Sequence, residues 1–77
     1  MPNSRPARVV RVKTSGLIYA LDAVLGPVGF TFGKLENYRG ESARELLDRG
    51  IREGAVLHLE YDQFGFVSLA RRAAEIA

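Results

Sequence analysis

The sequence predicts one α+β domain, in which a small mixed or antiparallel sheet of about four to five strands carries helices on one face. Three observations support this fold class. The 77 residues suit a single domain. Several segments alternate apolar and polar side chains, as half-buried strands do. A capped amphipathic segment in the middle of the chain has the spacing of a helix. One helical layer on a sheet is a common solution for such an element order.

The chain begins with a predicted extended basic arm over residues 1–7, followed by the domain over residues 8–77. Pro2 and Pro6 restrict the backbone of the arm and remove two backbone donors. Val9 to Lys13 alternates valine with basic residues and is predicted to be the first strand.

Residues 15–25 fit two structures, of which we favour a helix. Ser15 is a suitable N-cap, Gly26 follows the last turn, and Pro27 cannot continue a helix.

The alternative for the same segment is a hairpin that turns at Ser15 and Gly16. The strand that returns would then place Tyr19 opposite Val12, and Leu21 opposite Val10, on one apolar face.

A strand over residues 28–32 and a helix within residues 41–54 are predicted next. Phe30 and Phe32 fall on one face of the strand. Ser42 and Glu45 have the spacing of a capping box, and Gly50 is placed to end the helix in the left-handed conformation. The predicted inward stripe of the helix consists of Ala43, Leu46 and Leu47.

The C-terminal third is predicted to hold a hairpin and a last helix. Val56 to Tyr61 alternates as a strand with Leu57, Leu59 and Tyr61 on one side. Asp62 to Gly65 suits a type I turn, because Asp is favoured first and Gly fourth. Phe66 to Leu69 forms the returning strand, and Leu69 to Ile76 has the spacing of a short helix that must dock on the sheet.

The net charge of +2 conceals an uneven distribution along the chain. Residues 1–13 contain four basic and no acidic side chains, whereas residues 41–62 contain three arginines and six acidic residues. A basic segment of this kind attracts phosphate groups, although a solvated tail has the same composition. The candidate partner or phosphate contacts are Arg5, Arg8, Arg11 and Lys13.

Residue types and spacing argue against catalysis and bound cofactors. There is no cysteine and only one histidine, His58, so neither a thiolate nor a histidine-rich metal site is predicted. The glycines at 29 and 33 lie one residue too close for a phosphate-binding loop. Nothing pairs a nucleophile with a base. No apolar run is long enough for a membrane span. We expect no cofactor, no membrane partner, and a location in the cytoplasm or in a particle assembled there.

Residues 28–61 resemble a ubiquitin-like β-grasp domain, in particular its small YukD-like members. The Gly50-Ile51 pair, the following polar turn and the strand to Leu59 are similar to the end of that fold, and Phe30 to Leu35 is similar to its middle strand. The resemblance implies protein–protein interaction in secretion machinery. Residues 8–27 are too few for the hairpin and full helix of that family, and no C-terminal Gly-Gly is present.

Two further resemblances involve nucleic acids. Residues 43–69 resemble the AbrB-like DNA-binding fold, although residues 33–41 intervene before the helix. The run from Phe64 to Val67 resembles the aromatic strand of the RNA-recognition motif, which implies that Phe64 and Phe66 stack on bases. Asp62 stands before that run where a basic residue is usual. Packing in the core or hairpin is the ordinary alternative for both phenylalanines.

Two functions follow as hypotheses. The first is a non-catalytic protein-binding module that acts as an oligomeric subunit or adaptor of a larger assembly, such as a secretion system or a phage particle. A small core without disulfides or metal favours it, since such domains are often stabilised by partner subunits. The second is a small nucleic-acid-binding regulator that uses the basic N-terminal segment on phosphates.

Overall fold

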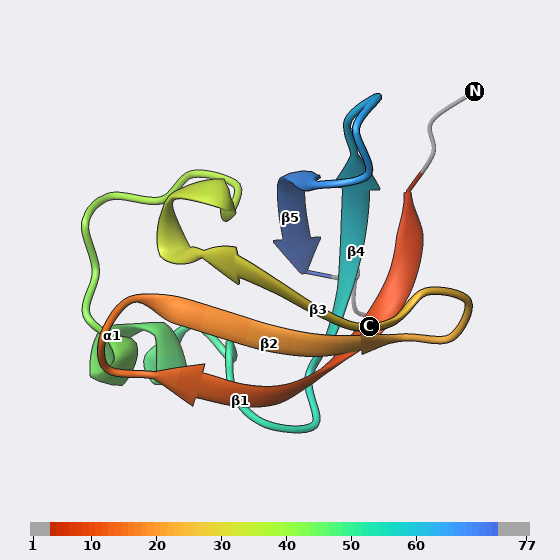
Figure 1. Cartoon of the computed structure of the whole chain (residues 1–77). Helices are drawn as coiled ribbons and strands as arrows, with labels where there is room; N and C mark the ends of the chain where they lie inside the picture. The colour runs from red at the N-terminus through yellow and green to blue at the C-terminus, as the bar shows by residue number, and fades with distance from the viewer. Residues whose placement is uncertain (1–3, 73–77) are drawn as a thin grey trace.

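The computed structural model describes residues 4–72 of the chain. In that part, strands dominate, and the helical structure is one short α-helix and one 3₁₀ turn (Figure 1). The elements in chain order are β1 (Arg5–Lys13), β2 (Leu17–Asp22), β3 (Gly26–Thr31), η1 (Phe32–Lys34), α1 (Ala43–Asp48), β4 (Val56–Tyr61) and β5 (Val67–Arg72).

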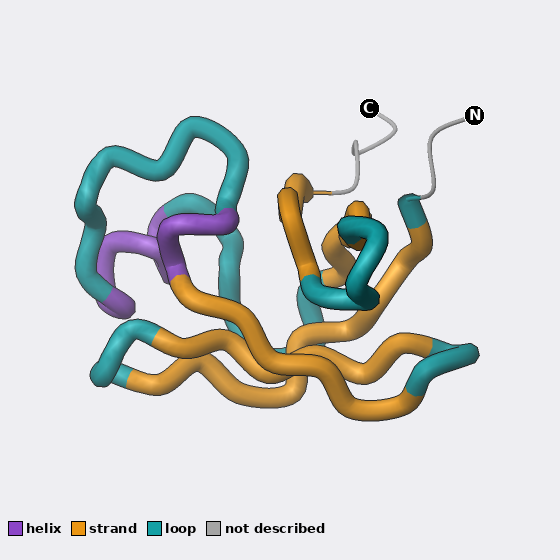
Figure 2. Tube along the Cα trace, turned by 45° about the horizontal axis from the view of Figure 1, so that its top comes forward, coloured by secondary structure: helices purple, strands orange, loops and turns teal. Residues whose placement is uncertain are grey.

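The five strands form one sheet in the order β3-β2-β1-β4-β5, and all neighbouring strands are antiparallel. Beyond β3, Leu35 forms an isolated parallel bridge with Ala70 of β5. The backbone N–H of Glu36 donates to the carbonyl of Ala70 at 2.7 Å. This contact brings the two ends of the sheet together, so the sheet curls into a partly closed barrel (Figure 2).

The predicted α+β class, with helices packed on one face of the sheet, is wrong. The structure is mostly antiparallel sheet, and α1 has only six residues. Of the three predicted helices, the first is a strand over residues 17–22 flanked by turns, and the last is a strand over its described residues 69–72. The sheet covers its apolar side by curving around it, rather than by placing a layer of helices on it (Figure 2).

The favoured helix over residues 15–25 is also wrong, and the hairpin alternative has the correct topology but the wrong register. β2 pairs with β1, with Ile18 opposite Val12 and Tyr19 opposite Arg11. Gly26 and Pro27, which resemble helix stop signals, are the first residues of β3.

The pairing of β2 with β1 differs from the expected register because the more apolar side of β2 faces solvent. Ile18 and Ala20 are fully buried, whereas Leu21 is half-exposed. Asp22 follows Ile18 and Ala20 on the inner side and interrupts an otherwise apolar inner face. The alternation of apolar and polar residues therefore identifies the wrong side of the strand.

The helix prediction within residues 41–54 is confirmed for α1. Both hydrogen bonds of the capping box between Ser42 and Glu45 are present, and Gly50 has a φ of 85°. Leu46 is fully buried, but Leu47 is 49% exposed, so the inward stripe is narrower than predicted.

The strand over Val56–Tyr61 is confirmed, as is the turn after it, in which the Gly65 N–H donates to the Asp62 carbonyl at 3.1 Å. The returning strand begins at Val67 and continues to Arg72. The predicted helix over Leu69–Ile76 is therefore wrong for residues 69–72, and residues 73–77 lie outside the described part. Pairing with β4 overrides the helical preference of the alanine and arginine residues here.

The core lies inside the curled sheet. One end of it is covered by η1, α1 and the loop after α1. The buried apolar residues come from every strand and from these segments. They are Ala7, Val9, Ile18, Ala20, Phe30, Phe32, Leu35, Leu46, Ile51, Leu57, Leu59, Val67 and Ala70.

Residues 5–7, expected to belong to the N-terminal arm, are part of β1. Arg5 pairs with Leu59 of β4, and Ala7 is buried opposite Leu57. β1 is therefore the central strand of the sheet, and the basic residues of the N-terminal segment are fixed on it.

Candidate nucleic-acid interface

The outer face of β1, β2 and β3 holds three of the four predicted basic contacts in one column. Arg8, Arg11 and Lys13 lie on β1 with their Cα atoms opposite Leu21, Tyr19 and Leu17 of β2. Those three β2 residues lie opposite Pro27, Gly29 and Thr31 of β3. We call these nine residues the basic face.

A bulge in β1 produces this column. The register with β2 shifts between Val9 and Arg11, which leaves Val10 as an extra residue. Val9 exchanges backbone hydrogen bonds with the segment before β4, at 2.8 Å to both Gly54 and Ala55. The bulge thus lies where β1 leaves β4, and it turns Arg11 and Lys13 to the same side as Arg8.

Tyr19 lies at the centre of the basic face and rests on the backbone of β3. A Cβ atom added at Gly29 would come within 3.0 Å of Tyr19 Cε1 and 3.1 Å of Cδ1. The absence of a side chain at position 29 therefore lets the ring lie close against the sheet. Lys13 Nζ lies 5.8 Å from the ring centroid, at the outer limit of a cation–π contact.

No acidic side chain in the described part of the chain pairs with the arginines of the basic face. Within residues 4–72, neither Arg8 nor Arg11 forms an ion pair with an acidic side chain. None of the nine residues is acidic. The face therefore presents two guanidinium groups, unpaired within the described residues, and an ammonium group around an aromatic ring, an arrangement that attracts anions.

Arg5, the fourth predicted contact, is not part of this face. Its Nε lies 3.3 Å from Oδ2 of Asp22, and its guanidinium lies over the Tyr61 ring, with Cζ 5.1 Å from the ring centroid. Arg5 is thus engaged with Asp22 and Tyr61 at this end of the barrel, with its side chain partly exposed, and a phosphate contact by Arg5 stays a prediction.

Asp22 connects three parts of the fold at this end. Its side chain is 1% exposed and accepts hydrogen bonds from Val24 N at 2.7 Å, Leu25 N at 3.0 Å and the Tyr61 hydroxyl at 2.7 Å. Burial raises the pKa of the Asp22 carboxyl, but these hydrogen bonds and the charge of Arg5 together lower it by more, so its pKa lies below the ordinary value. Burial and the hydrogen bond to Asp22 raise the pKa of Tyr61 to about 12.

The aromatic turn between β4 and β5 projects its two phenylalanines into solvent. Phe64 is 75% exposed and Phe66 is 71% exposed, so the interpretation of either as core is wrong. Oδ1 of Asp62 accepts hydrogen bonds from the backbone N–H groups of both, at 2.9 and 3.0 Å. The turn is therefore held by the Asp62 side chain together with its own backbone hydrogen bonds, and its aromatic side chains are left without a packing role in the described fold.

We expect Phe66→Ala to change the free energy of unfolding by no more than about 0.5 kcal/mol, because the removed ring is mostly in water. Urea denaturation measures this, with Leu46→Ala as the buried control at about 2 to 5 kcal/mol. A loss of more than about 2 kcal/mol for Phe66→Ala would show that the ring is buried.

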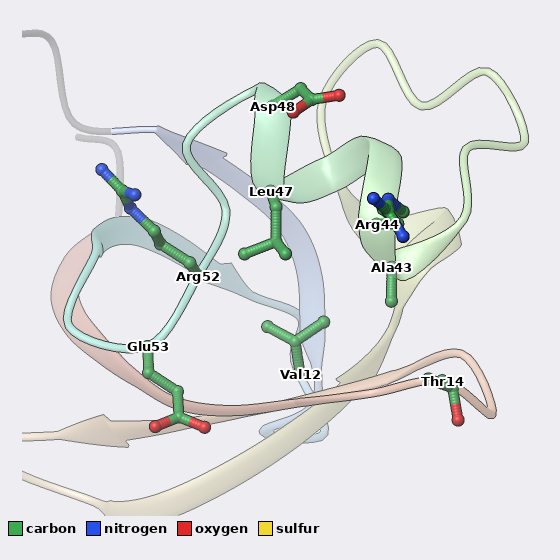
Figure 3. Close-up of a pocket in the computed structure, with 8 residues that line it drawn as sticks. All are labelled: Val12, Thr14, Ala43, Arg44, Leu47, Asp48, Arg52 and Glu53. Atoms are coloured by element: carbon green, nitrogen blue, oxygen red, sulfur yellow. The ribbon is translucent and has the colours of Figure 1, made fainter.

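Another hollow lies between α1 and the end of β1, with a volume of about 780 Å³. Leu47 of α1 and Val12 of β1 point toward each other across it (Figure 3). The remaining lining includes two arginines, Arg44 and Arg52, and two acids, Asp48 and Glu53. Equal numbers of both charges give this hollow no preference for an anion or a cation.

The described residues contain no cluster of three or more potential metal ligands. Among residues 4–72, no helix has the length and apolar character needed to cross a membrane.

The strand order and the position of the helix define the topology of this small barrel. Three meandering strands are followed by a helix and a hairpin that returns beside the first strand, and Leu35, beyond η1, forms one parallel bridge with the last strand. This strand order is the same as that of the five-stranded, partly open OB-fold barrel. Comparisons with protein-family models, curated proteins and solved structures found no match to this chain.

Tyr19 is the functional candidate that sequence reasoning missed. The hairpin alternative for residues 15–25 places Tyr19 opposite Val12 on one apolar face and gives it no functional role. In the structure its ring lies on Gly29 of the neighbouring strand. The useful signal was present in Gly29 itself, because a glycine inside a strand often marks the close approach of another group.

Proposed function

We propose that this protein binds single-stranded nucleic acid on its basic face. The observation that carries the proposal is the half-buried ring of Tyr19 on Gly29, beside the guanidinium groups of Arg8 and Arg11, which form no ion pair within residues 4–72. Proteins that bind single strands combine basic grooves with aromatic rings on which bases stack.

Stacking energies favour a base over the lysine contact at Tyr19. A cation–π contact at an exposed site contributes about 0.5 to 1 kcal/mol. Base–aromatic stacking contributes about 1 to 3 kcal/mol. A base therefore displaces the Lys13 ammonium from the ring, and the ammonium becomes available to a neighbouring phosphate.

Single strands suit the basic face better than a duplex. An aromatic ring stacks only on a base whose own face is open, and the basic face offers no projecting helix or ribbon to enter a groove. The architecture supports the proposal by analogy, since OB-folds bind oligonucleotides and oligosaccharides on the face of their second and third strands.

The test is fluorescence anisotropy with labelled thymidine and uridine oligonucleotides. We expect binding that weakens as salt rises. We expect Tyr19→Leu to weaken it by about 1 to 3 kcal/mol, roughly fivefold to 150-fold in Kd, because the apolar contact with the sheet is kept and the stacking is lost.

Tyr19→Phe is the matched control and should retain most of the affinity. Binding that is unaffected by Tyr19→Leu, or no binding of either oligonucleotide at low salt, would contradict the proposal.

A protein-binding function in a larger assembly is the second candidate. The exposure of Phe64 and Phe66 in the β4–β5 turn supports it, together with that of Val24 and Leu25 in the β2–β3 turn. Large exposed apolar side chains in surface turns can form contacts between proteins. Light scattering on a size-exclusion column tests it, since a defined oligomer that Phe64→Ser dissociates is the expected result and a monomer would contradict self-association.

A further inference from the structure

We infer that the basic face selects two consecutive guanines, with Arg11 and Arg8 each reading one base. The inference rests on the proposed binding of single strands and names the preferred ligand of the same site.

The basic face contains two adjacent rows of the same design. In the first, Tyr19 lies between Arg11 of β1 and Gly29 of β3, and in the second, Leu21 lies between Arg8 and Pro27. The first row therefore offers the half-buried aromatic ring of Tyr19 for stacking, and the second offers the half-exposed aliphatic side chain of Leu21 for apolar contact. Each row has a guanidinium beside it on β1.

The second row also has room for a base. A shallow hollow of about 350 Å³ adjoins it, lined by Pro6, Ala7, Arg8, Leu21, Ala23 and Val56. Leu21 is 50% exposed, and Val56, which lies opposite Arg8 on β4, is 44% exposed. The lining is apolar except for Arg8, so the guanidinium is the one group there that can distinguish the polar edges of bases.

The spacing of the two rows matches an unstacked dinucleotide. The platforms are two residues apart on β2, which corresponds to roughly 7 Å along a strand. Stacked bases are about 3.4 Å apart, so two bases on these platforms are separated and each rests on its own row. Consecutive nucleotides of an extended single strand are thereby held one to a row.

Chemistry at the edge of the base selects guanine. A base that lies on a β2 platform turns one edge toward β1, where the arginine of that row is located. Guanine offers two acceptors, O6 and N7, that match the paired donors of a guanidinium. At the corresponding edge, which faces the major groove in a duplex, adenine and cytosine carry an amino donor, and thymine offers one acceptor. Since neither arginine has an acidic partner within residues 4–72, both are available for this role.

The experiment compares short thymidine strands with two central guanines, two central adenines, two central cytosines or no replacement. Fluorescence anisotropy is measured in lithium buffer, which disfavours guanine quadruplexes. We expect the guanine strand to bind at least about tenfold more tightly than the all-thymine strand, in keeping with the usual discrimination by a bidentate pair.

The double variant Arg8→Lys, Arg11→Lys keeps both charges and removes the paired donors. We expect the guanine preference to fall to within about twofold, while affinity for the all-thymine strand changes by less than about threefold. The matched control Arg39→Lys, Arg44→Lys lies off the basic face and should keep the preference.

Two results would overturn the guanine inference alone: wild-type binding without preference among the strands, or a preference that survives in the Arg8→Lys, Arg11→Lys variant. Failure to bind any strand would overturn the inference together with the proposed function.

Discussion

Asp22→Ala is expected to lower the free energy of unfolding by about 3 to 5 kcal/mol, since it leaves the partners of a buried charge unsatisfied. The substitution removes the acceptor for the N–H groups of Val24 and Leu25 and for the Tyr61 hydroxyl, and it leaves Arg5 without its counter-charge. A domain of this size has a total stability of roughly 4 to 11 kcal/mol, so much of the variant will be unfolded at moderate urea concentrations. Urea denaturation followed by circular dichroism measures the effect.

Asp62→Ala is the matched control for that experiment. Asp62 also accepts two backbone N–H groups in a turn, but it is exposed and its turn carries no buried charge. We expect a loss of about 1 kcal/mol. Equal losses for the two variants would show that burial and the contacts with Arg5 and Tyr61 add nothing at Asp22.

The pH dependence supplies an independent readout of the same contacts. Because the pKa of Asp22 is lowered in the folded state, its stabilising contribution is present above its ordinary pKa near 3.8 and is lost as the pH falls through the lower folded-state value. Asp22→Ala should therefore remove part of the acid sensitivity of the domain as well as part of its stability.

Replacement of Arg8, Arg11 and Lys13 by glutamine is expected to weaken the binding of single strands by about a hundredfold at 0.1 M salt. Each phosphate contact contributes about 0.7 to the slope of log affinity against log salt concentration for single strands. On an all-thymine strand, where no guanine engages the arginines and all three cations contact phosphates, the three lost contacts reduce that slope by about 2, and the difference in affinity grows as salt is lowered. Anisotropy titrations across a range of salt concentrations measure both quantities.

The control for net charge replaces Arg39, Arg44 and Arg52 by glutamine. It changes the charge of the chain by the same amount but leaves the basic face intact. If this control lost as much affinity as the β1 variant, binding would depend on net charge and not on the basic face.

Features of the fold that depend on nearby residues were predictable from the sequence. Ser42 and Glu45 identify the start of α1 because the capping box is formed within one turn. Leu57 and Leu59 identify β4 because its inner side is apolar throughout. The turn at Asp62 is equally local.

Features of the fold and of the site that depend on distant residues could not be predicted from the sequence. Asp22 occupies an inward position on β2 that only its contacts with Arg5 and Tyr61 make favourable. The role of Arg5 could not be distinguished from that of Arg8, because Asp22, the counter-charge of Arg5, lies on another strand. Tyr19 becomes a stacking candidate only when β3 brings Gly29 beneath its ring.

The most direct test of the central claim is a heteronuclear NMR titration of the isotope-labelled protein with a short single-stranded oligonucleotide. The account predicts shifts in the amides of β1, β2 and β3 around Arg8, Arg11 and Tyr19, and in the ring of Tyr19. Shifts confined to the aromatic turn at residues 62–66 or to the hollow beside α1, or no shifts at a saturating concentration, would contradict it.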